Sequence, residues 1–306
     1  MNEDRTLQDG HDTRIPRCCP TRRRFLASAA AALALPAAAR AQAGLRVATL
    51  DWAILETLLA LGADVVAATE LAEFRKVAVT PAVPETVADL GLRGTPNFEV
   101  LRFARPDLIF NSNFYGWAND RISHIAPVET HSVYVPGELP YALAETMTRA
   151  IGARLGLTGT AYADEVAGEM RRIGSALAGQ AKRPVLVINL GDARHFRVFG
   201  ADSMFGEAMA LIGFGNAWDQ PTSYSAMAPV GIEALAAYPD AWIALVDPTP
   251  EDARAVLKTS AFWQALPAVA AGRVLSLGAI NPYGALPAAR RFATQFEKAM
   301  NHARQG

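Results

Sequence analysis

Cysteine is almost absent from this chain of 306 residues. Its two cysteines, Cys18 and Cys19, both precede an apolar segment near the N-terminus, and neither stands after that segment, where a lipid-attachment cysteine would lie. The sequence beyond them contains no thiol, which excludes disulfides, cysteine nucleophiles and cysteine metal ligands there. We therefore expect a fold that depends on burial of its apolar core.

Catalytic signatures are also missing. The sequence has no G-x-S-x-G, no phosphate-binding P-loop and no H-E-x-x-H, and the segment 213–218, GFGNAW, lacks the third glycine of a dinucleotide-binding loop. An enzyme is therefore not supported, and we expect no catalytic residue and no cofactor.

Histidines are few, and their spacing does not indicate a metal site. His124 and His131 flank a loop that contains Pro127 and Glu129, so a metal site formed by the two histidines and Glu129 is one hypothesis. That spacing matches no usual set of ligands. We expect packing or surface roles for these histidines and no metal bound by the protein itself.

The chain has no apolar run long enough to span a bilayer. The longest, 25–39, is shorter than the roughly 20 residues that a spanning helix needs, and Pro36 interrupts it. Arg22-Arg23 followed by Phe25-Leu26 resembles a twin-arginine export signal, and Ala41-Gln42-Ala43 fits a cleavage site. We expect residues 1–43 to be such a signal and the mature protein to be periplasmic.

The chain also has no excess of positive charge. The predicted signal holds seven of the 29 Lys and Arg residues and four of the 30 Asp and Glu residues, so the remainder has 22 basic and 26 acidic side chains and a net charge of −4. This balance gives no indication of nucleic-acid binding.

What the sequence does contain is an alternation of short apolar runs with helical patterns, which is typical of α/β proteins with mostly parallel sheets. A helical pattern covers residues 52–61. The runs that we expect to be strands are 46–50, 65–68, 108–110, 133–135, 185–190, 242–246 and 274–277.

A long helical stretch divides the chain into two similar parts. We expect an N-terminal α/β lobe at 44–138, a helical connector at 139–180 with a break between Gly152 and Gly159, and a C-terminal α/β lobe at 181–306. A connector of this kind is stiffer than crossing strands, so we also expect little lobe movement on binding.

The two predicted lobes share a short sequence pattern. Residues 98–101, FEVL, lead to Pro106-Asp107 and an apolar run, and residues 232–235, IEAL, lead to Pro239-Asp240 and another. Each predicts a helix with a glutamate in its first turns, a turn and a buried strand. The same succession recurs in unrelated α/β proteins, but two similar lobes are the interpretation that we favour.

Four segments carry a resemblance to a known family. They are GLRGTPNFEVLRFARPDLIF at 91–110, VFGADSMFGEAMALIGFGNAW at 198–218, FWQALPAVAAGRV at 262–274 and PYGA at 282–285. From about Val47 to its end, the chain resembles the periplasmic binding proteins of ABC importers that carry iron–siderophore complexes, especially the ferric-hydroxamate binders. The resemblance implies a class III fold: two Rossmann-like lobes joined by a long helical connector.

The resemblance also implies how the ligand is held. In this family, residues that match Arg93 and Tyr115 donate hydrogen bonds to the iron-bound hydroxamate oxygens, and the protein supplies no ligand to the iron. A guanidinium suits chelator oxygens that keep negative charge. From the residues alone, Arg93 has a second interpretation, a salt bridge to Glu99 or Asp89.

The remaining cleft positions differ from the family pattern. The resemblance places Asn111, Trp218, Tyr224, Ser225, Asn281 and Tyr283 in the binding cleft. Where the hydroxamate binder has tryptophans, this chain has Val77, Asn111, Ser225 and Asn281. We therefore expect a more polar pocket, and a hydroxamate chelate that bears carboxylates is an open possibility.

Two glutamates are expected to contact the permease. In this family, residues that match Glu99 and Glu233 dock on arginines of the two subunits of the inner-membrane permease. The alternative is that each only complements its own helix dipole.

The resemblance thus implies a monomeric substrate-binding component whose partners are a ferric siderophore and an ABC permease. Two other hypotheses stay open: a carrier of haem, cobalamin or another metal chelate, and an exported α/β enzyme.

Overall fold

The computed structural model describes residues 44–180, 183–222 and 226–304. The predicted export signal at 1–43 lies outside the described residues. In the described part of the chain, no helix combines the length and the hydrophobicity that a membrane-spanning helix requires.

The first sheet is entirely parallel, and its strand order is β3-β2-β1-β4-β5. This order is that of a Rossmann-like half. Its strands are β1 (Arg46–Thr49), β2 (Asp64–Ala68), β3 (Ala88–Asp89), β4 (Leu108–Asn111) and β5 (Val128–Thr130). The helices and turns between them are α2 (Trp52–Ala60), α3 (Leu71–Val77), α4 (Phe98–Ala104), the 3₁₀ segment η2 (Asn113–Ala118) and α5 (Asn119–Ile122).

The predicted strand at 133–135 is wrong. The fifth strand of this sheet is Val128–Thr130, and residues 133–135 form an irregular loop. Val133 and Tyr134 are buried because they pack into the core, not because they belong to a sheet. A short apolar run reports burial and does not by itself distinguish a strand from a buried loop.

The second sheet is mixed, with the strand order β10-β9-β6-β7-β8. Strands β10, β9 and β6 are parallel, whereas β7 is antiparallel to both β6 and β8. The mostly parallel arrangement predicted for this half therefore holds for three of its strands. The strands are β6 (Val185–Leu190), β7 (His195–Phe199), β8 (Ala226–Gly231), β9 (Trp242–Asp247) and β10 (Val274–Ala279).

The helices of the second half include one 3₁₀ segment. They are α8 (Met204–Leu211), η4 (Ile232–Ala237), α9 (Glu251–Thr259), α10 (Ala261–Ala265) and α11 (Pro267–Ala270). The repeated sequence pattern forms a helical segment followed by a strand in both halves: α4 and β4 in the first, and η4 and β9 in the second. In both halves, an arginine donates a hydrogen bond to the aspartate of the Pro-Asp turn. The backbone N–H of Arg46 donates to Asp107 Oδ2 (2.9 Å), and Arg183 Nη1 donates to Asp240 Oδ1 (3.0 Å).

The stretch between the sheets is a helical hairpin. Helix α6 (Pro140–Leu155) ends at Gly156, whose φ of +67° suits glycine, and α7 (Gly159–Leu177) follows, with the 3₁₀ turn η3 (Ala178–Gln180) after it. Gly152 and Gly159 face each other so closely that a Cβ on either would collide with the other's backbone. The break predicted between these glycines is thus confirmed as the turn of the hairpin.

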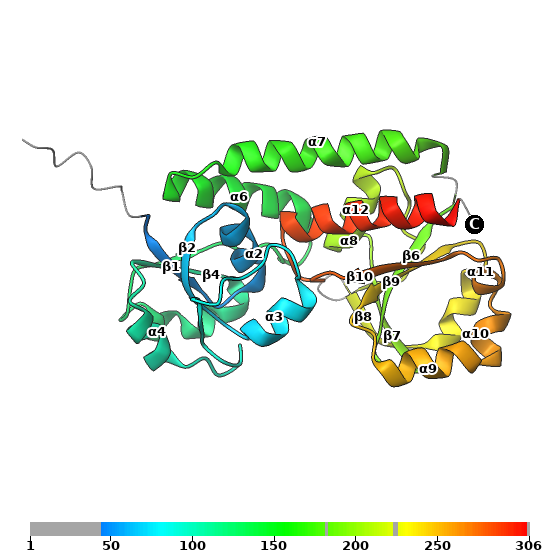
Figure 1. Cartoon of the computed structure of the whole chain (residues 1–306), viewed down its shortest axis with the longest axis horizontal. Coiled ribbons are helices and arrows are strands. Elements are labelled where there is room, and N and C mark those ends of the chain that lie inside the picture. Colours follow the sequence, from blue (N-terminus) through cyan, green and yellow to red (C-terminus); the bar gives the residue numbers. More distant parts are fainter. Residues whose placement is uncertain (1–43, 181–182, 223–225, 305–306) are drawn as a thin grey trace, which may run out of the picture. The chain divides into compact units, whose positions relative to one another are not determined.

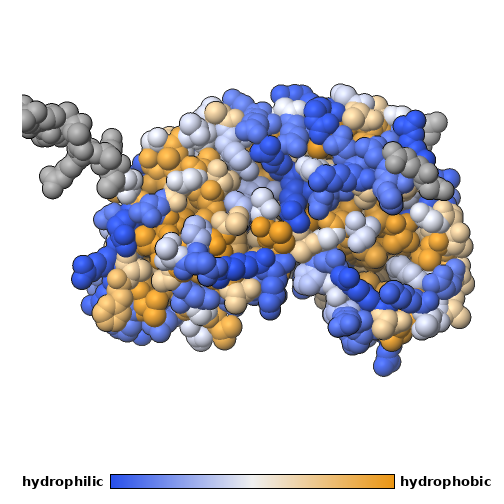
Figure 2. Space-filling model, in the orientation of Figure 1, coloured by the Kyte–Doolittle hydropathy of each residue, from blue (hydrophilic) through white to orange (hydrophobic). Residues whose placement is uncertain are grey.

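The C-terminal helix α12 (Leu286–Ala303) packs against α7 and α8 and also contacts α2 and α6 (Figure 1). Buried side chains of α7 recur every three or four residues, from Ala163 to Leu177, and its other face is largely hydrophilic (Figure 2).

One segment near the C-terminus completes the first lobe. After β10, Asn281 Nδ2 donates to Glu56 Oε1 (2.9 Å), and the backbone N–H of Ala285 donates to Glu56 Oε2 (3.1 Å). Tyr134 Oη donates to the carbonyl of Gly284 (2.6 Å). A Cβ at Gly284 would collide with the Glu56 carboxylate, so the PYGA motif needs its glycine for a close approach. We call residues 281–285 the crossing segment.

Candidate functional site

Two adjoining cavities lie at the carboxyl ends of strands. The first has a volume of about 290 Å³ and is lined by Asp51, Trp52, Arg93, Phe114, Tyr115, Tyr134 and Tyr283. The second has a volume of about 360 Å³, shares Trp52, Arg93 and Tyr283 with the first, and reaches residues of the second sheet such as Asn189, Arg197, Phe199 and Asp247. Open α/β sheets bind ligands at this edge. We call the two cavities together the cleft.

Arg93 belongs to both cavities and is positioned from two sides. Its Nε forms a salt bridge with Glu70 Oε2 (2.6 Å), and its backbone N–H donates to Glu70 Oε1 (3.1 Å). Its guanidinium lies over the ring of Trp52, 4.1 Å from the ring centroid. With 37% of its side chain exposed, Arg93 is held in place and still presents donors to the cleft.

The predicted alternative partners of Arg93 are wrong. Asp89 instead accepts from the backbone N–H groups of Leu71 and Gly91, and Glu99 is exposed in the first turn of α4. The partner is Glu70, which precedes α3 in the left-handed region at φ 50°. Arg93 therefore forms a salt bridge and also reaches the cleft, although the sequence analysis treated these two roles as alternatives.

Tyr115 lines the first cavity together with Arg93. It belongs to η2 and lies at a kink where its backbone is not helical. Burial, followed by the charge of Asp51, raises the pKa of Tyr115 to about 12, although the charge and hydrogen bonding of Arg93 oppose the rise. The phenol therefore keeps its proton at neutral pH and acts as a hydrogen-bond donor.

A buried carboxyl group lies at the floor of the first cavity. Asp51 caps α2 by accepting from the backbone N–H groups of Ala53 and Ile54, and Ser112 Oγ donates to its Oδ2 (2.7 Å). Burial raises the pKa of Asp51, and these hydrogen bonds partly offset the rise. Ser112 follows β4 and directly precedes η2, which holds Tyr115, so its hydrogen bond links this part of the chain to the start of α2, which holds Trp52.

The crossing segment supplies one wall. The rings of Tyr283 and Tyr134 meet edge to face, with centroids 5.4 Å apart. Asn281 lines the second cavity, but its side chain is almost fully buried and donates to Glu56. Val77 lines the same cavity.

Other predicted residues lie apart from the cleft lining. Asn111 is fully buried, and its amide donates to the carbonyl of Tyr115 (2.9 Å) and to Asn119 Oδ1 (2.7 Å). Trp218 is 8% exposed and packs against Tyr238 in the core of the second lobe. Tyr224 and Ser225 lie outside the described residues.

Among the lining residues that the sequence analysis missed are Asp51, Trp52 and Arg197, and Glu70 adds to them as the salt-bridge partner of Arg93. Asp51 and Trp52 stand directly after the first predicted strand, so the strand-end rule that located Tyr115 applies to them equally. Arg197 lies on β7, which was not predicted. Glu70 is 23 residues from Arg93, and no sequence spacing indicates that pair.

The two predicted docking glutamates are both exposed near the start of a helical segment, Glu99 in α4 and Glu233 in the 3₁₀ segment η4. The histidines do not converge on a metal site. His131 Nε2 is 4.0 Å from Glu129 Oε2, and burial lowers the pKa of His131. Among the described residues, no three His, Cys, Asp or Glu side chains are arranged to hold a metal ion.

Comparison with known proteins connects this cleft to a family. The family model described as periplasmic binding protein matches residues 47–280, which include every described residue of the cleft apart from the wall at 281–283. The chain belongs to the periplasmic binding protein family. Members of this family are substrate-binding transport proteins.

Individual relatives agree with this assignment. The chain is 31% identical over 257 residues to the iron(3+)-hydroxamate-binding protein FhuD of Escherichia coli, an alignment that covers 83% of this chain and 86% of the relative.

Solved structures show the same fold. The FhuD of Vibrio cholerae bound to Fe³⁺–Desferal has a TM-score of 0.78 at 22% identity, with 85% of this chain and 99% of that chain covered. FhuD2 of Staphylococcus aureus with bound ferrioxamine B has a TM-score of 0.67 at 17% identity, with 85% and 99% covered. The class III architecture of two Rossmann-like lobes is therefore confirmed.

Proposed function

We propose that this protein is the substrate-binding component of an ABC importer and that its cleft captures a ferric siderophore of the hydroxamate type. The observation that carries the proposal is the pairing of Arg93 with Tyr115 in the first cavity. Both side chains donate hydrogen bonds, and a ferric chelate presents oxygens that retain negative charge. The similarity to FhuD of Escherichia coli supports the same ligand class.

The environment of Arg93 suits this role. Glu70 occupies Nε, and Trp52 covers one face of the guanidinium, so the other nitrogens are oriented before a ligand arrives. A donor that is positioned in advance loses less entropy on binding, which increases affinity. We assign to Asn111 a positioning role, because its amide holds the carbonyl of Tyr115.

Arg197 extends the site into the second lobe. It lines the second cavity, and no salt bridge to Arg197 is present among the described residues. The cleft thus has an arginine from each lobe, beside the polar side chains of Asn189 and Asn281. This polarity favours a hydroxamate chelate that carries additional carboxylates. Tyr224, Ser225 and Tyr283 remain proposed ligand contacts, whereas Trp218 packs in the core of the second lobe and is not proposed as one.

Tyr115 bears on the alternative ligands. A tyrosine that ligates haem or a bare ferric ion does so as phenolate, whereas Tyr115 shares the first cavity with the Arg93 guanidinium, whose positive charge repels a bare ferric ion. The site therefore supports recognition of a complete chelate over direct ligation of iron, and a carrier of haem or cobalamin is the second hypothesis that the ligand panel below tests.

The wider assignment follows from the same proposal. We propose export to the periplasm by the twin-arginine route through residues 1–43, a monomeric protein without catalytic activity, and lobes bounded at 44–138 and 181–306 around the connector at 139–180. Docking on the permease is proposed for Glu99 and Glu233, which are both exposed.

Tryptophan fluorescence tests the ligand class, because Trp52 lines both cavities. Ferrioxamine B, ferrichrome, a carboxylate-bearing ferric hydroxamate, ferric citrate, haem and cobalamin are titrated, with iron-free desferrioxamine as the control. We expect saturable quenching by a ferric hydroxamate and weaker binding of the iron-free chelator. Tight binding of haem or cobalamin with none of the hydroxamates would refute the proposal.

Arg93→Ala is the matched variant for this assay. Loss of its charge-assisted hydrogen bonds is expected to weaken binding by about 2–4 kcal/mol, or roughly 30- to 1,000-fold. The thermal midpoint should change little, since a half-exposed salt bridge contributes only about 0–1 kcal/mol. Glu70→Gln removes the charge that pairs with Arg93 and keeps the guanidinium. It therefore separates the effect of losing the salt bridge from the effect of losing the hydrogen-bond donor. An Arg93→Ala dissociation constant equal to the wild-type value would exclude Arg93 from recognition.

A further inference from the structure

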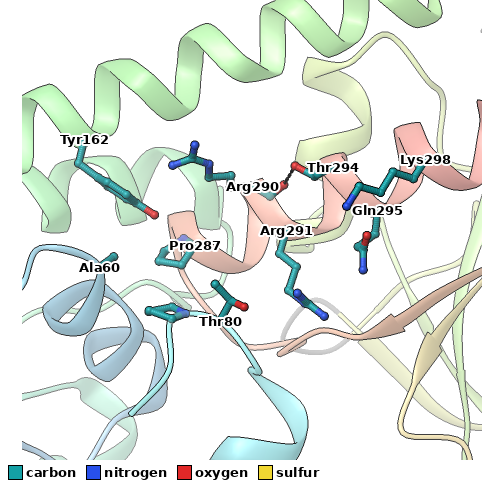
Figure 3. A pocket seen from close by; sticks show the side chains of 10 residues that line it. Ala60, Thr80, Tyr162, Pro287, Arg290, Arg291, Thr294, Gln295 and Lys298 are labelled. Carbon is teal, nitrogen blue, oxygen red and sulfur yellow. Dashed lines mark hydrogen bonds between the residues drawn. The ribbon is translucent and has the colours of Figure 1, made fainter. Parts of the chain in front are cut away.

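A separate pocket of about 380 Å³ lies beside the C-terminal helix and shares no lining residue with the cleft (Figure 3). Its wall combines the end of α2, the loop after α3, α7 and one side of α12. The lining residues are Ala60, Thr80, Pro81, Tyr162, Pro287, Arg290, Arg291, Thr294, Gln295 and Lys298.

The charge of this pocket is unbalanced. Its lining contains three basic side chains and no acidic one. Arg290 is neutralised from α7, because its Nη2 lies 2.8 Å from Glu165 Oε1 and its Nε lies 2.6 Å from Glu169 Oε2. For Arg291 and Lys298, no salt bridge is present within the described residues. The buried carboxyl group of Glu56 acts on the charge of Arg291 without forming a salt bridge to it.

Helix geometry brings the uncompensated groups together. Arg291, Gln295 and Lys298 are spaced i, i+4 and i+7, which places them on one face of α12. Figure 3 shows the three side chains leaving α12 on the side of the pocket, whereas Arg290 extends toward α7. Arg291 is fixed by donation from Nε to the carbonyl of Ala279 (2.8 Å), and burial lowers its pKa. A half-buried guanidinium that has no salt bridge favours an anion beside it, and Lys298 adds an exposed positive charge on the same helix face.

The rest of the lining is largely apolar. Ala60, Pro81 and Pro287 contribute aliphatic surface, and Tyr162 contributes its ring. The volume lies within the range of sites for small organic ligands, which combine apolar walls with a few polar groups. We propose that this pocket binds a small amphipathic organic anion, with its carboxylate at Arg291 and Lys298 and its apolar body against Pro81, Pro287 and Tyr162.

Calorimetric titration of the purified protein with 2-naphthoate tests this proposal, and the uncharged 2-naphthamide is the matched ligand. The two ligands have the same ring system and differ in the charge of the head group. Because the carboxylate gains charge-assisted hydrogen bonds, we expect naphthoate to bind at least about tenfold more tightly than the amide. Equal binding of the two, or no binding of naphthoate, would overturn the proposal.

Three variants locate the site. Arg291→Gln with Lys298→Gln removes both charges, and we expect naphthoate affinity to fall at least about tenfold. Ala60→Leu fills the pocket from α2, retains the charges and is compatible with a helix, and it is expected to block binding as well. Lys258→Gln on α9 removes one exposed charge far from the lining and should bind like the wild type.

A variant of the cleft completes the design. Arg93→Ala should leave naphthoate binding unchanged, because Arg93 does not line this pocket. If naphthoate affinity fell in Arg93→Ala and persisted in the α12 double variant and in Ala60→Leu, the anion would bind in the cleft and the proposed site would be refuted.

Discussion

Glu56 is expected to make the stability of this protein depend on pH in an unusual direction. Its carboxyl group is buried beneath the crossing segment, where it accepts from Asn281 and from the backbone of Ala285. Burial raises the pKa of Glu56 from its ordinary value of 4.5 to about 8, and these two hydrogen bonds oppose the rise. The negative charge of Asp51 acts in the same direction as burial.

The sign follows from proton binding. Between pH 4.5 and about 8, the folded protein retains a proton on Glu56 that the unfolded chain has already lost, so the free energy of unfolding falls as the pH rises through this range. Each pH unit corresponds to about 1.4 kcal/mol, so the full effect on the free energy of unfolding is about 5 kcal/mol. Below pH 4.5 both states are protonated and this contribution to stability is fully present.

Urea unfolding followed by circular dichroism from pH 4.5 to 9 measures this effect. Glu56→Gln cannot ionise, so we expect its stability to lack the decline. In this variant the side-chain amide oxygen still accepts from Asn281, but the amide N–H points at the backbone N–H of Ala285. This unfavourable contact should lower the free energy of unfolding by about 1–3 kcal/mol at pH 5. The variant is therefore expected to be less stable than the wild type at pH 5 and more stable at pH 9. The exposed Glu138→Gln is the matched control. Parallel pH profiles for the wild type and Glu56→Gln would refute the reasoning.

Three further predictions concern binding and transport. Tyr115→Phe should weaken ferric hydroxamate binding by about 0.5–1.5 kcal/mol, less than Arg93→Ala, because one neutral hydroxyl is lost; an unchanged dissociation constant by fluorescence titration would remove the hydroxyl from recognition. Glu99→Ala with Glu233→Ala should preserve ligand affinity and melting temperature and abolish uptake through the cognate permease in reconstituted vesicles, because exposed charges steer docking more than they stabilise the carrier; wild-type uptake would return both residues to a dipole role. Ligand should change the radius of gyration little in small-angle scattering, because α6 and α7 form a stiff hairpin; a large change would contradict this.

Strands were predictable from sequence where they are central and apolar. β1, β2, β4, β6, β9 and β10 all correspond to apolar runs, because parallel strands buried on both faces require them. The missed strands are of another kind. β8 contains Pro229 and exposes most of its side chains, and β7 alternates buried Phe196 and Val198 with the half-buried Arg197. β3 is only two residues long.

The cleft was only partly predictable, because local sequence does not indicate which distant residues meet. Arg93 and Tyr115 were located through a motif and a strand end, and both line the first cavity. Glu70 pairs with Arg93 through a left-handed turn that no spacing rule reveals. Asn281 was assigned to the cleft, whereas its amide serves Glu56, which is 225 residues away in the sequence.

The crossing segment has a consequence for how this chain is synthesised. Glu56 lies near the beginning of the described chain, and the groups that satisfy it, Asn281 and Ala285, lie near its end. A polypeptide that emerges N-terminus first therefore carries this carboxyl group without its partners until translation is nearly finished. The first lobe is synthesised first, but the hydrogen bonds around Glu56 and Tyr134 close last. Its final consolidation during biogenesis must wait for release of the C-terminal residues from the ribosome.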